Sequence, residues 1–129
     1  MRILPCLLLA WSVISTDVQA QTVKESQDAA VAAIRKLGGN VTFDEKSPGK
    51  PLVSVDLMDS KVTDAGLVHL KGLTKLQSLS LISTKVTDAG LVHLKGLTKL
   101  QSLNLSFSKV TDAGVKDLQT ALPKCKIQK

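Results

Sequence analysis

The sequence predicts an α/β fold in which short strands and helices alternate along a stack of similar coils, an arrangement called a solenoid. The segment Lys61–Leu67 (KVTDAGL) recurs as Lys85–Leu91 and, ending in valine, as Lys109–Val115, each time after 24 residues. Residues 61–79 and 85–103 are identical at every position. A fixed period in this range is typical of stacked-repeat proteins, whose units bury their apolar faces against their neighbours.

Each unit combines a strand pattern with a helix pattern. Leu79 and Leu81 alternate with polar residues, so both point to one side of a short strand. Leu91, Leu94 and Leu97 then recur every third residue, as on one face of a helix, and we expect about ten helical residues in each unit. Stacking would place parallel strands on the concave side and helices on the convex side.

Two further residue types recur near the start of each predicted helix. Thr87 before Asp88 fits a helix N-cap, where the hydroxyl accepts a hydrogen bond from a free N–H and the acid favours the helix dipole. Gly66, Gly90 and Gly114 fall within the first helical turn. We interpret these glycines as a packing feature, because no glycine-rich phosphate loop surrounds them.

The repeats resemble the leucine-rich repeat family, in the variant that carries a V-T-D-x-G-L segment after the strand. They are similar to small secreted bacterial proteins of this kind and to the cysteine-containing repeats of F-box proteins. The resemblance covers about residues 51–127 and implies a short right-handed solenoid that binds its ligand on the concave face. Ser60, Thr84 and Ser108 stand where many such repeats carry Asn or Cys. Their hydroxyls can still bond loop backbone, but they cannot build the longer asparagine ladder.

The chain is expected to divide into three segments. Residues 1–20 have a charged start, an apolar run too short to span a bilayer and small residues at their end, which is the pattern of a cleaved signal peptide. An uncleaved anchor is the alternative. Residues 21–51 would form a capping helix and strand, and residues 52–129 about three repeats with a C-terminal cap, because a solenoid exposes its core at both ends. The protein would then be exported, to the periplasm or the extracellular space, with no membrane span after cleavage.

The C-terminal end of the chain has its own signals. Pro123 should end the last helix, and Cys125 and Ile127 alternate with polar residues as in a last strand. Cys125 is the one cysteine that remains after cleavage, so no disulfide can form within the exported chain. We interpret Cys125 as a small buried residue. A reactive thiol between two lysines is the alternative.

Composition limits the possible functions. The 129 residues carry a net charge of +6, and they include no tyrosine, one tryptophan and two phenylalanines. Nucleic acid is disfavoured as a partner, because aromatic residues for base stacking and arginines for phosphate are scarce. No nucleophile–base pair, pair of acids or phosphate loop stands out, so we predict no enzyme activity, no catalytic residue and no cofactor.

One column of the repeats contains metal-ligand residue types. His69, His93 and Asp117 occupy the same repeat position, and two histidines with a carboxylate can bind a metal ion. The residues of one column run in a line along a solenoid, however, so they do not converge on one ion. We predict solvated helix residues and no metal site.

A basic column lies near the predicted strand ends. Lys61, Lys85 and Lys109 form it and could bind an acidic polymer or envelope polysaccharide through counterion release. An acidic column runs close to it, formed by Asp64, Asp88 and Asp112. Neighbouring columns of opposite charge also suit an ordinary solvated surface. Both interpretations stay open.

The repeats differ from one another on the exposed side of the predicted strands. The candidate binding residues on this concave face are Ser54, Asp56, Met58, Ser78, Ser80, Ile82, Ser102, Asn104 and Ser106. Met58 and Ile82 occupy matching positions and are the best candidate for an apolar binding anchor, although isolated exposed apolar residues are common on surfaces. We therefore predict a non-enzymatic protein-interaction module whose partner the sequence does not name. The alternatives are the electrostatic polymer binder and, implied only by the F-box resemblance, a ubiquitin-ligase substrate adaptor.

Overall fold

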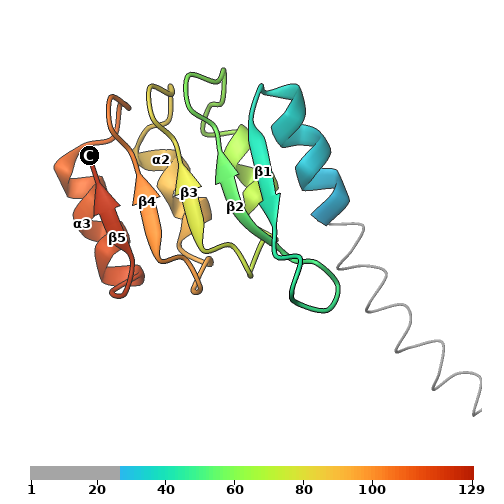
Figure 1. Ribbon diagram of the computed structural model, residues 1–129. Helices are drawn as coiled ribbons and strands as arrows, with labels where there is room; N and C mark the ends of the chain where they lie inside the picture. Colours follow the sequence, from blue (N-terminus) through green and yellow to red (C-terminus); the bar gives the residue numbers. More distant parts are fainter. Residues whose placement is uncertain (1–26) are drawn as a thin grey trace, which may run out of the picture.

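The computed structural model describes residues 27–129 and has an α/β fold with a five-stranded sheet in the order β1-β2-β3-β4-β5 (Figure 1). The strands are β1 (Asn40–Phe43), β2 (Leu52–Asp56), β3 (Ser78–Ser80), β4 (Ser102–Asn104) and β5 (Lys126–Gln128). β1 pairs with β2 in the antiparallel direction, and the pairs from β2 to β5 are parallel. The predicted α/β class and parallel repeat strands are confirmed. The predicted signal peptide, residues 1–20, lies outside the described residues.

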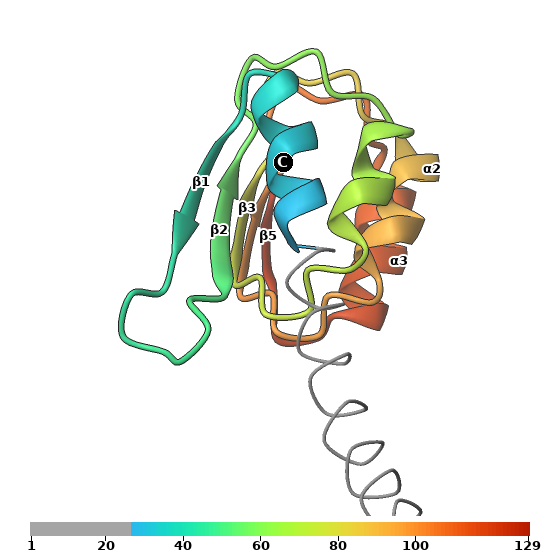
Figure 2. The ribbon, with the colours of Figure 1, turned by 90° about the vertical axis from the view of Figure 1, so that its right-hand side faces the viewer.

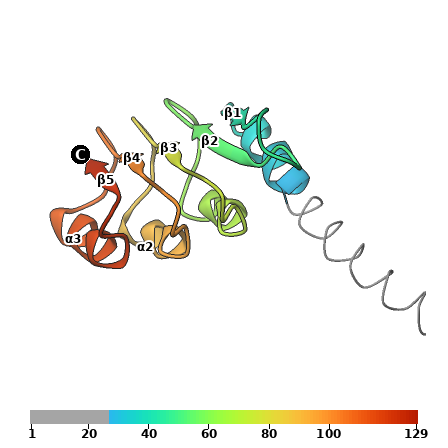
Figure 3. The ribbon, with the colours of Figure 1, turned by 60° about the horizontal axis from the view of Figure 1, so that its bottom comes forward.

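The described helices lie on one side of the sheet (Figure 2). They are the N-terminal helix (27–36 in its described part), the 3-10 helix η1 (Gly66–Leu70), α2 (Asp88–Leu91), the 3-10 helix η2 (Val92–Leu94) and α3 (Asp112–Ala121). Figure 3 shows the same arrangement along the strands, with the opposite sheet face uncovered by any described helix. We call that face the open face. Within residues 27–129 no helix is both long and apolar enough to cross a bilayer.

The helices of the two inner repeats are shorter and tighter than predicted. The expected length of about ten residues is right only for α3, which has 10 residues, whereas η1 has 5 and α2 has 4. Leu91, Leu94 and Leu97 recur every third residue, which is the period of a 3-10 helix. In α3 the step from Val115 to Leu118 is followed by a step of four to the next buried leucine, as on an α-helical face.

The core lies between the sheet and the helices and is almost entirely aliphatic. Leu79 and Leu81, predicted to point to one side of their strand, are 1% and 0% exposed. Leu91, Leu94 and Leu97 are buried on the helical side of the same unit. Burying one leucine completely contributes about 1.5–3 kcal/mol before the entropic cost of ordering it. Because equivalent positions are buried in each repeat, the core is continuous from coil to coil.

The N-terminal helix contributes its apolar stripe to this core. Ala30, Val31 and Ile34 are buried against the first coil. The helix ends where Gly38 takes a positive φ of 86°, and the Gly39 N–H donates a hydrogen bond to the Ile34 carbonyl at 2.9 Å. Glycine tolerates this left-handed conformation, which closes the helix in a Schellman motif. The chain then enters β1, which is the strand predicted within residues 21–51.

The C-terminal end follows the predicted order of helix, proline and strand. α3 ends at Ala121, two residues before Pro123, and β5 extends the sheet beside β4. Cys125 is a free cysteine and is 3% exposed, and burial raises the pKa of its thiol. The interpretation of Cys125 as a small buried residue is confirmed. The alternative of a reactive thiol loses its support, because the nucleophilic form is the thiolate.

Candidate functional site

The open face carries the candidate binding residues in the predicted phase. Val55, Leu79 and Leu103 point into the core and are at most 1% exposed, whereas the candidate residues beside them are exposed or half-buried. Strand register arranges the candidates in columns: Ser54, Ser78 and Ser102, then Asp56, Ser80 and Asn104. The same register adds Lys126 and Gln128 at the C-terminal end of the two columns. Whether these residues bind a partner stays a prediction.

Two candidate residues also shape the loops after their strands. Asp56 accepts a hydrogen bond from the Met58 N–H at 3.0 Å, and Asn104 accepts one from the Ser106 N–H at 3.0 Å. The buried Ser80 hydroxyl, at the equivalent position, has no hydrogen-bond partner among the described residues. Substitutions at Asp56 and Asn104 would therefore change the loops as well as the surface.

Met58 and Ile82 lie beside each other at the strand ends, as their matching positions predict. The Asp59 N–H donates to the Ile82 carbonyl at 2.9 Å, which joins the two loops. Met58 is 48% exposed and Ile82 is half-buried. Ser106 follows at the next equivalent position. The pair is thus a small apolar area on an otherwise polar face.

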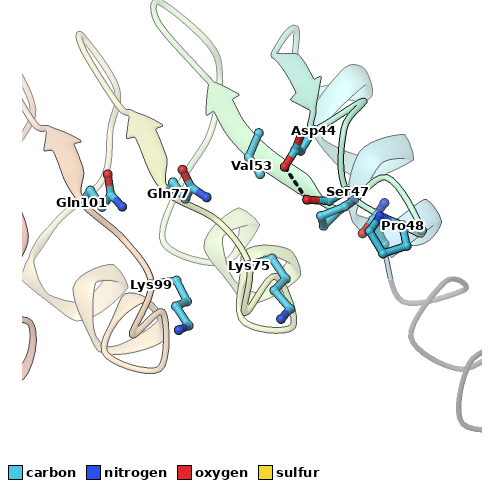
Figure 4. Close-up of a pocket in the computed structure, with 11 residues that line it drawn as sticks. Asp44, Ser47, Pro48, Val53, Lys75, Gln77, Lys99 and Gln101 are labelled. Atoms are coloured by element: carbon cyan, nitrogen blue, oxygen red, sulfur yellow. Dashed lines mark hydrogen bonds between the residues drawn. The ribbon is translucent and has the colours of Figure 1, made fainter.

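A pocket with a volume of about 540 Å³ lies where the chain enters β2, β3 and β4 (Figure 4). Lys75 and Gln77 line it from one coil and Lys99 and Gln101 from the next, and the loop 44–51 closes one side. No ion pair involves either lysine in the described part of the chain. The pocket offers amide and ammonium groups from the two coils, and the Asp44 carboxylate and Ser47 hydroxyl from the loop.

Hydrogen bonds hold the loop beside this pocket. The Asp44 carboxylate accepts a hydrogen bond from the Ser47 hydroxyl at 2.6 Å and from the Lys46 N–H at 2.9 Å, and these bonds lower the pKa of Asp44. The Gln27 side chain bridges the loop, because its amide N–H donates to the Lys50 carbonyl and its oxygen accepts from the Leu52 N–H. The pocket wall is therefore tied to the N-terminal helix.

The acidic column connects one coil to the next. Asp64 accepts hydrogen bonds from the Thr87 N–H at 2.7 Å and the Thr87 hydroxyl at 2.5 Å, and Asp88 makes the same two bonds with Thr111. Thr87 is the N-cap residue of α2, as predicted, but its hydroxyl accepts no hydrogen bond from the helix N–H groups and only donates to Asp64. Thr111 does cap its helix and accepts from the Gly114 N–H at 3.3 Å.

The repeated glycines leave room for these aspartates. A Cβ added to Gly90 would lie 2.5 Å from a carboxylate oxygen of Asp64, and one added to Gly114 would collide with the carboxylate of Asp88. The packing interpretation of the glycines is confirmed. The acidic column stays partly solvated, but the carboxylates of Asp64 and Asp88 also bond the next coil, which the sequence interpretation did not predict.

The last aspartate of the column has a different partner. The Lys129 ammonium forms an ion pair with Asp112 at 2.5 Å. Hydrogen bonds from Thr111 lower the pKa of Asp88, and the hydrogen bond and charge of Lys129 lower the pKa of Asp112. Folding therefore favours the ionised form of both carboxylates.

These pKa shifts predict a loss of stability in acid. A carboxyl group whose pKa is lower in the folded state than its ordinary value of 3.8 stabilises the fold above that value, and this contribution disappears as the pH falls through the folded pKa. We expect the melting temperature to drop below about pH 4. Asp88→Asn should make that drop shallower, because Asn does not titrate. Thermal unfolding followed by circular dichroism across this pH range tests it, and an unchanged pH profile in the variant would exclude Asp88 as a contributor.

The hydroxyls that replace the expected Asn or Cys behave as predicted in two of the three coils. The Thr84 hydroxyl donates to the Leu81 carbonyl at 2.8 Å and the Ser108 hydroxyl to the Leu105 carbonyl at 2.6 Å. The Ser60 hydroxyl is buried without a hydrogen-bond partner in the described region, so the prediction is wrong for the first coil.

The predicted charged columns stay on the surface. Lys61, Lys85 and Lys109 are all exposed in successive loops, and none forms an ion pair within residues 27–129. His69 is exposed and His93 is half-buried. Across the same residues, no group of three His, Cys, Asp or Glu side chains could hold a metal ion.

Phe107 is a surface feature that the sequence interpretation missed. Its side chain is 87% exposed, and its backbone takes a positive φ of 59°. The equivalent residues in the other coils, Asp59 and Ser83, are polar and have the same conformation, with φ of 53° and 56°. An apolar residue at a loop position that is polar in both other copies was the available signal.

The comparison with known families agrees with the repeat geometry. Residues 96–118, which run through β4 into α3, match the family model described as Leucine Rich repeat. The chain is a leucine-rich repeat protein. Leucine-rich repeats are in general scaffolds for protein interaction and are not enzymes. No curated protein matches the chain, and the specific V-T-D-x-G-L type of repeat stays a prediction.

Proposed function

We propose that this leucine-rich repeat protein is a protein-interaction module that binds its partner on the open face of the sheet. The observation that carries the proposal is the Met58–Ile82 pair, held side by side on a polar face that no described helix covers. Small serines on the same face, such as Ser78 and Ser102, leave room for side chains of a partner. Interface energy concentrates in a few such apolar anchors surrounded by polar contacts.

Substitution of both anchors tests this proposal. Met58→Asp with Ile82→Asp should weaken binding to the partner captured by the unsubstituted protein by more than about 1 kcal/mol per site. The fold should change little, because Met58 is 48% exposed and Ile82 is half-buried. Isothermal titration calorimetry gives the affinity, and circular dichroism checks the fold.

The helical side of the molecule offers a matched control. Val68 and Val92 are 48% and 58% exposed and are also separated by one repeat. Val68→Asp with Val92→Asp should leave binding unchanged if the open face is the binding surface. Equal affinity of the Met58 and Ile82 variant and the unsubstituted protein would instead move the binding site elsewhere.

We further propose that the coils form a short solenoid with a cap at each end. Support at the first end comes from the N-terminal helix, which buries Ala30, Val31 and Ile34 over the first coil. At the other end, β5 extends the sheet beside β4, and Lys129 forms an ion pair with Asp112. Substitution of Ile34 tests the N-terminal cap.

Export is also a proposal, supported by the charged start, apolar run and small residues of positions 1–20. Cleavage should follow Ala20 and leave Gln21 as the first residue. Intact-mass analysis of the protein recovered from the periplasm or medium tests this. A mass that includes Met1 on exported protein would exclude cleavage.

A further inference from the structure

The three loops that follow the repeat strands share a residue in the left-handed conformation. Asp59, Ser83 and Phe107 occupy this position with φ of 53°, 56° and 59°. Asn, Asp and Gly adopt the conformation most readily, and for bulky side chains it is a genuine outlier. The residue type at Phe107 therefore conflicts with the backbone that the repeat imposes.

The exposed Phe107 side chain does not stabilise the fold through burial. The Phe107 ring is 87% exposed, so it contributes almost no burial that could offset the backbone cost. It is also one of only two phenylalanines in the chain. An exposed aromatic residue on a strained backbone is the combination expected at a binding site, where contacts with a partner use both.

Two exposed lysines lie in the Phe107 loop and in the loop before it. Lys109 lies two residues further along the same loop and is exposed. The Ser83 N–H donates to the Ser106 carbonyl at 2.9 Å, which joins the Phe107 loop to the preceding one, where Lys85 is also exposed. Neither lysine forms an ion pair among residues 27–129. Two uncompensated ammonium groups therefore accompany the aromatic side chain.

We propose that this surface, Phe107 with Lys85 and Lys109, docks an acidic peptide segment of a partner protein. A large apolar side chain of the segment would pack on the Phe107 ring, and carboxylates on both sides would pair with the lysines. Charge complementarity selects an acidic segment over a basic one. The proposal rests on the proposed protein-binding function and names the chemistry of the ligand. It adds the loops that carry Phe107, Lys85 and Lys109 to the binding surface on the open face.

Selection of peptides on the full chain tests the proposal without a known partner. A display library of random peptides is panned on the protein, and enriched peptides are synthesised for affinity measurements. We expect them to combine Asp or Glu with a large apolar residue. Phe107→Asn should weaken their binding by at least about tenfold, the loss typical of an interface anchor. Lys85→Gln with Lys109→Gln should weaken it and reduce its salt dependence.

The same substitution should have the opposite effect on stability. Asn tolerates a positive φ better than Phe, so Phe107→Asn should raise the melting temperature while binding falls. Ser83→Asn is the control at the equivalent position of the previous coil and should leave peptide affinity unchanged. Loss of binding together with a higher melting temperature cannot come from unfolding.

Three results would overturn the proposal. The first is that no peptide is enriched, or that the enriched peptides lack an acidic bias. The second is that the enriched peptides bind Phe107→Asn with full affinity. The third is salt-sensitive binding of polyglutamate that is equally strong in Phe107→Asn, which would indicate that lysines alone bind polyanions. Enriched peptides that lose binding in Met58→Asp with Ile82→Asp, but keep it in Phe107→Asn, would leave the proposed open-face function intact. Failure of both sets of variants to affect any captured protein would remove that function too.

Discussion

Ile34→Asp is expected to leave most of the protein unfolded at room temperature. Ile34 is 1% exposed and belongs to the core, next to Leu57: a Cβ added to Gly39 would touch both side chains. Replacing a buried isoleucine costs about 2–5 kcal/mol through lost burial and the cavity left behind. An unpaired buried carboxylate adds several kcal/mol or draws water into the core. The sum is comparable to the whole stability of a typical domain, about 5–15 kcal/mol.

A neighbouring alanine provides the control for this experiment. Ala32 lies in the same helix and is exposed, so Ala32→Asp introduces the same charge on the solvent side. Its melting temperature, measured by circular dichroism, should stay close to that of the unsubstituted protein. If Ile34→Asp also melted near the original temperature, the N-terminal helix would not be needed to cover the first coil, and the cap proposal would fail.

The repeat period predicts most of the fold because each coil supplies the same contacts to its neighbour. Leu79 and Leu103 lie 24 residues apart, and the register places them side by side in the core. Once the strand phase is known, the outward positions follow, and the open face with Met58 and Ile82 follows from them. The antiparallel β1 could not be predicted in this way, since it precedes the first repeat and pairs with β2 through a local hairpin.

The repeat pattern gave wrong or incomplete predictions where the same residue type fits two different structural roles. The Asp64 side chain bonds Thr87, 23 residues later, but a repeated acid looks the same whether it faces solvent or the next coil. A repeated leucine every third position fits both a helix face and a 3-10 turn, which explains the error in helix length. At Phe107 the sequence shows an apolar residue where both other copies are polar, but the positive φ that the three loops share is visible only in three dimensions.

Gly114→Ala should destabilise the protein although alanine is the better helix former. Alanine normally gains up to about 1 kcal/mol over glycine in a helix. At this position, however, the added methyl group would collide with the Asp88 carboxylate that bonds Thr111. Overpacking of this kind costs about 1–3 kcal/mol, so we expect a net loss of about 1 kcal/mol in the free energy of unfolding. Gly96→Ala is the control, since nothing lies within 4 Å of its added Cβ, and it should be neutral or stabilising.

A double-mutant cycle shows whether the carboxylate is the cause. Asp88→Ala alone should lower the free energy of unfolding, because it removes both hydrogen bonds to Thr111. The variant also removes the atoms closest to the Gly114 methyl group and leaves one contact of 3.1 Å to the Cβ of residue 88, which a small shift can relieve. Gly114→Ala should therefore be nearly neutral in the Asp88→Ala background, with the two effects clearly non-additive in urea unfolding. Strict additivity would show that Gly114 and Asp88 act independently, and the repeated glycine would need another explanation than the aspartate of the preceding coil.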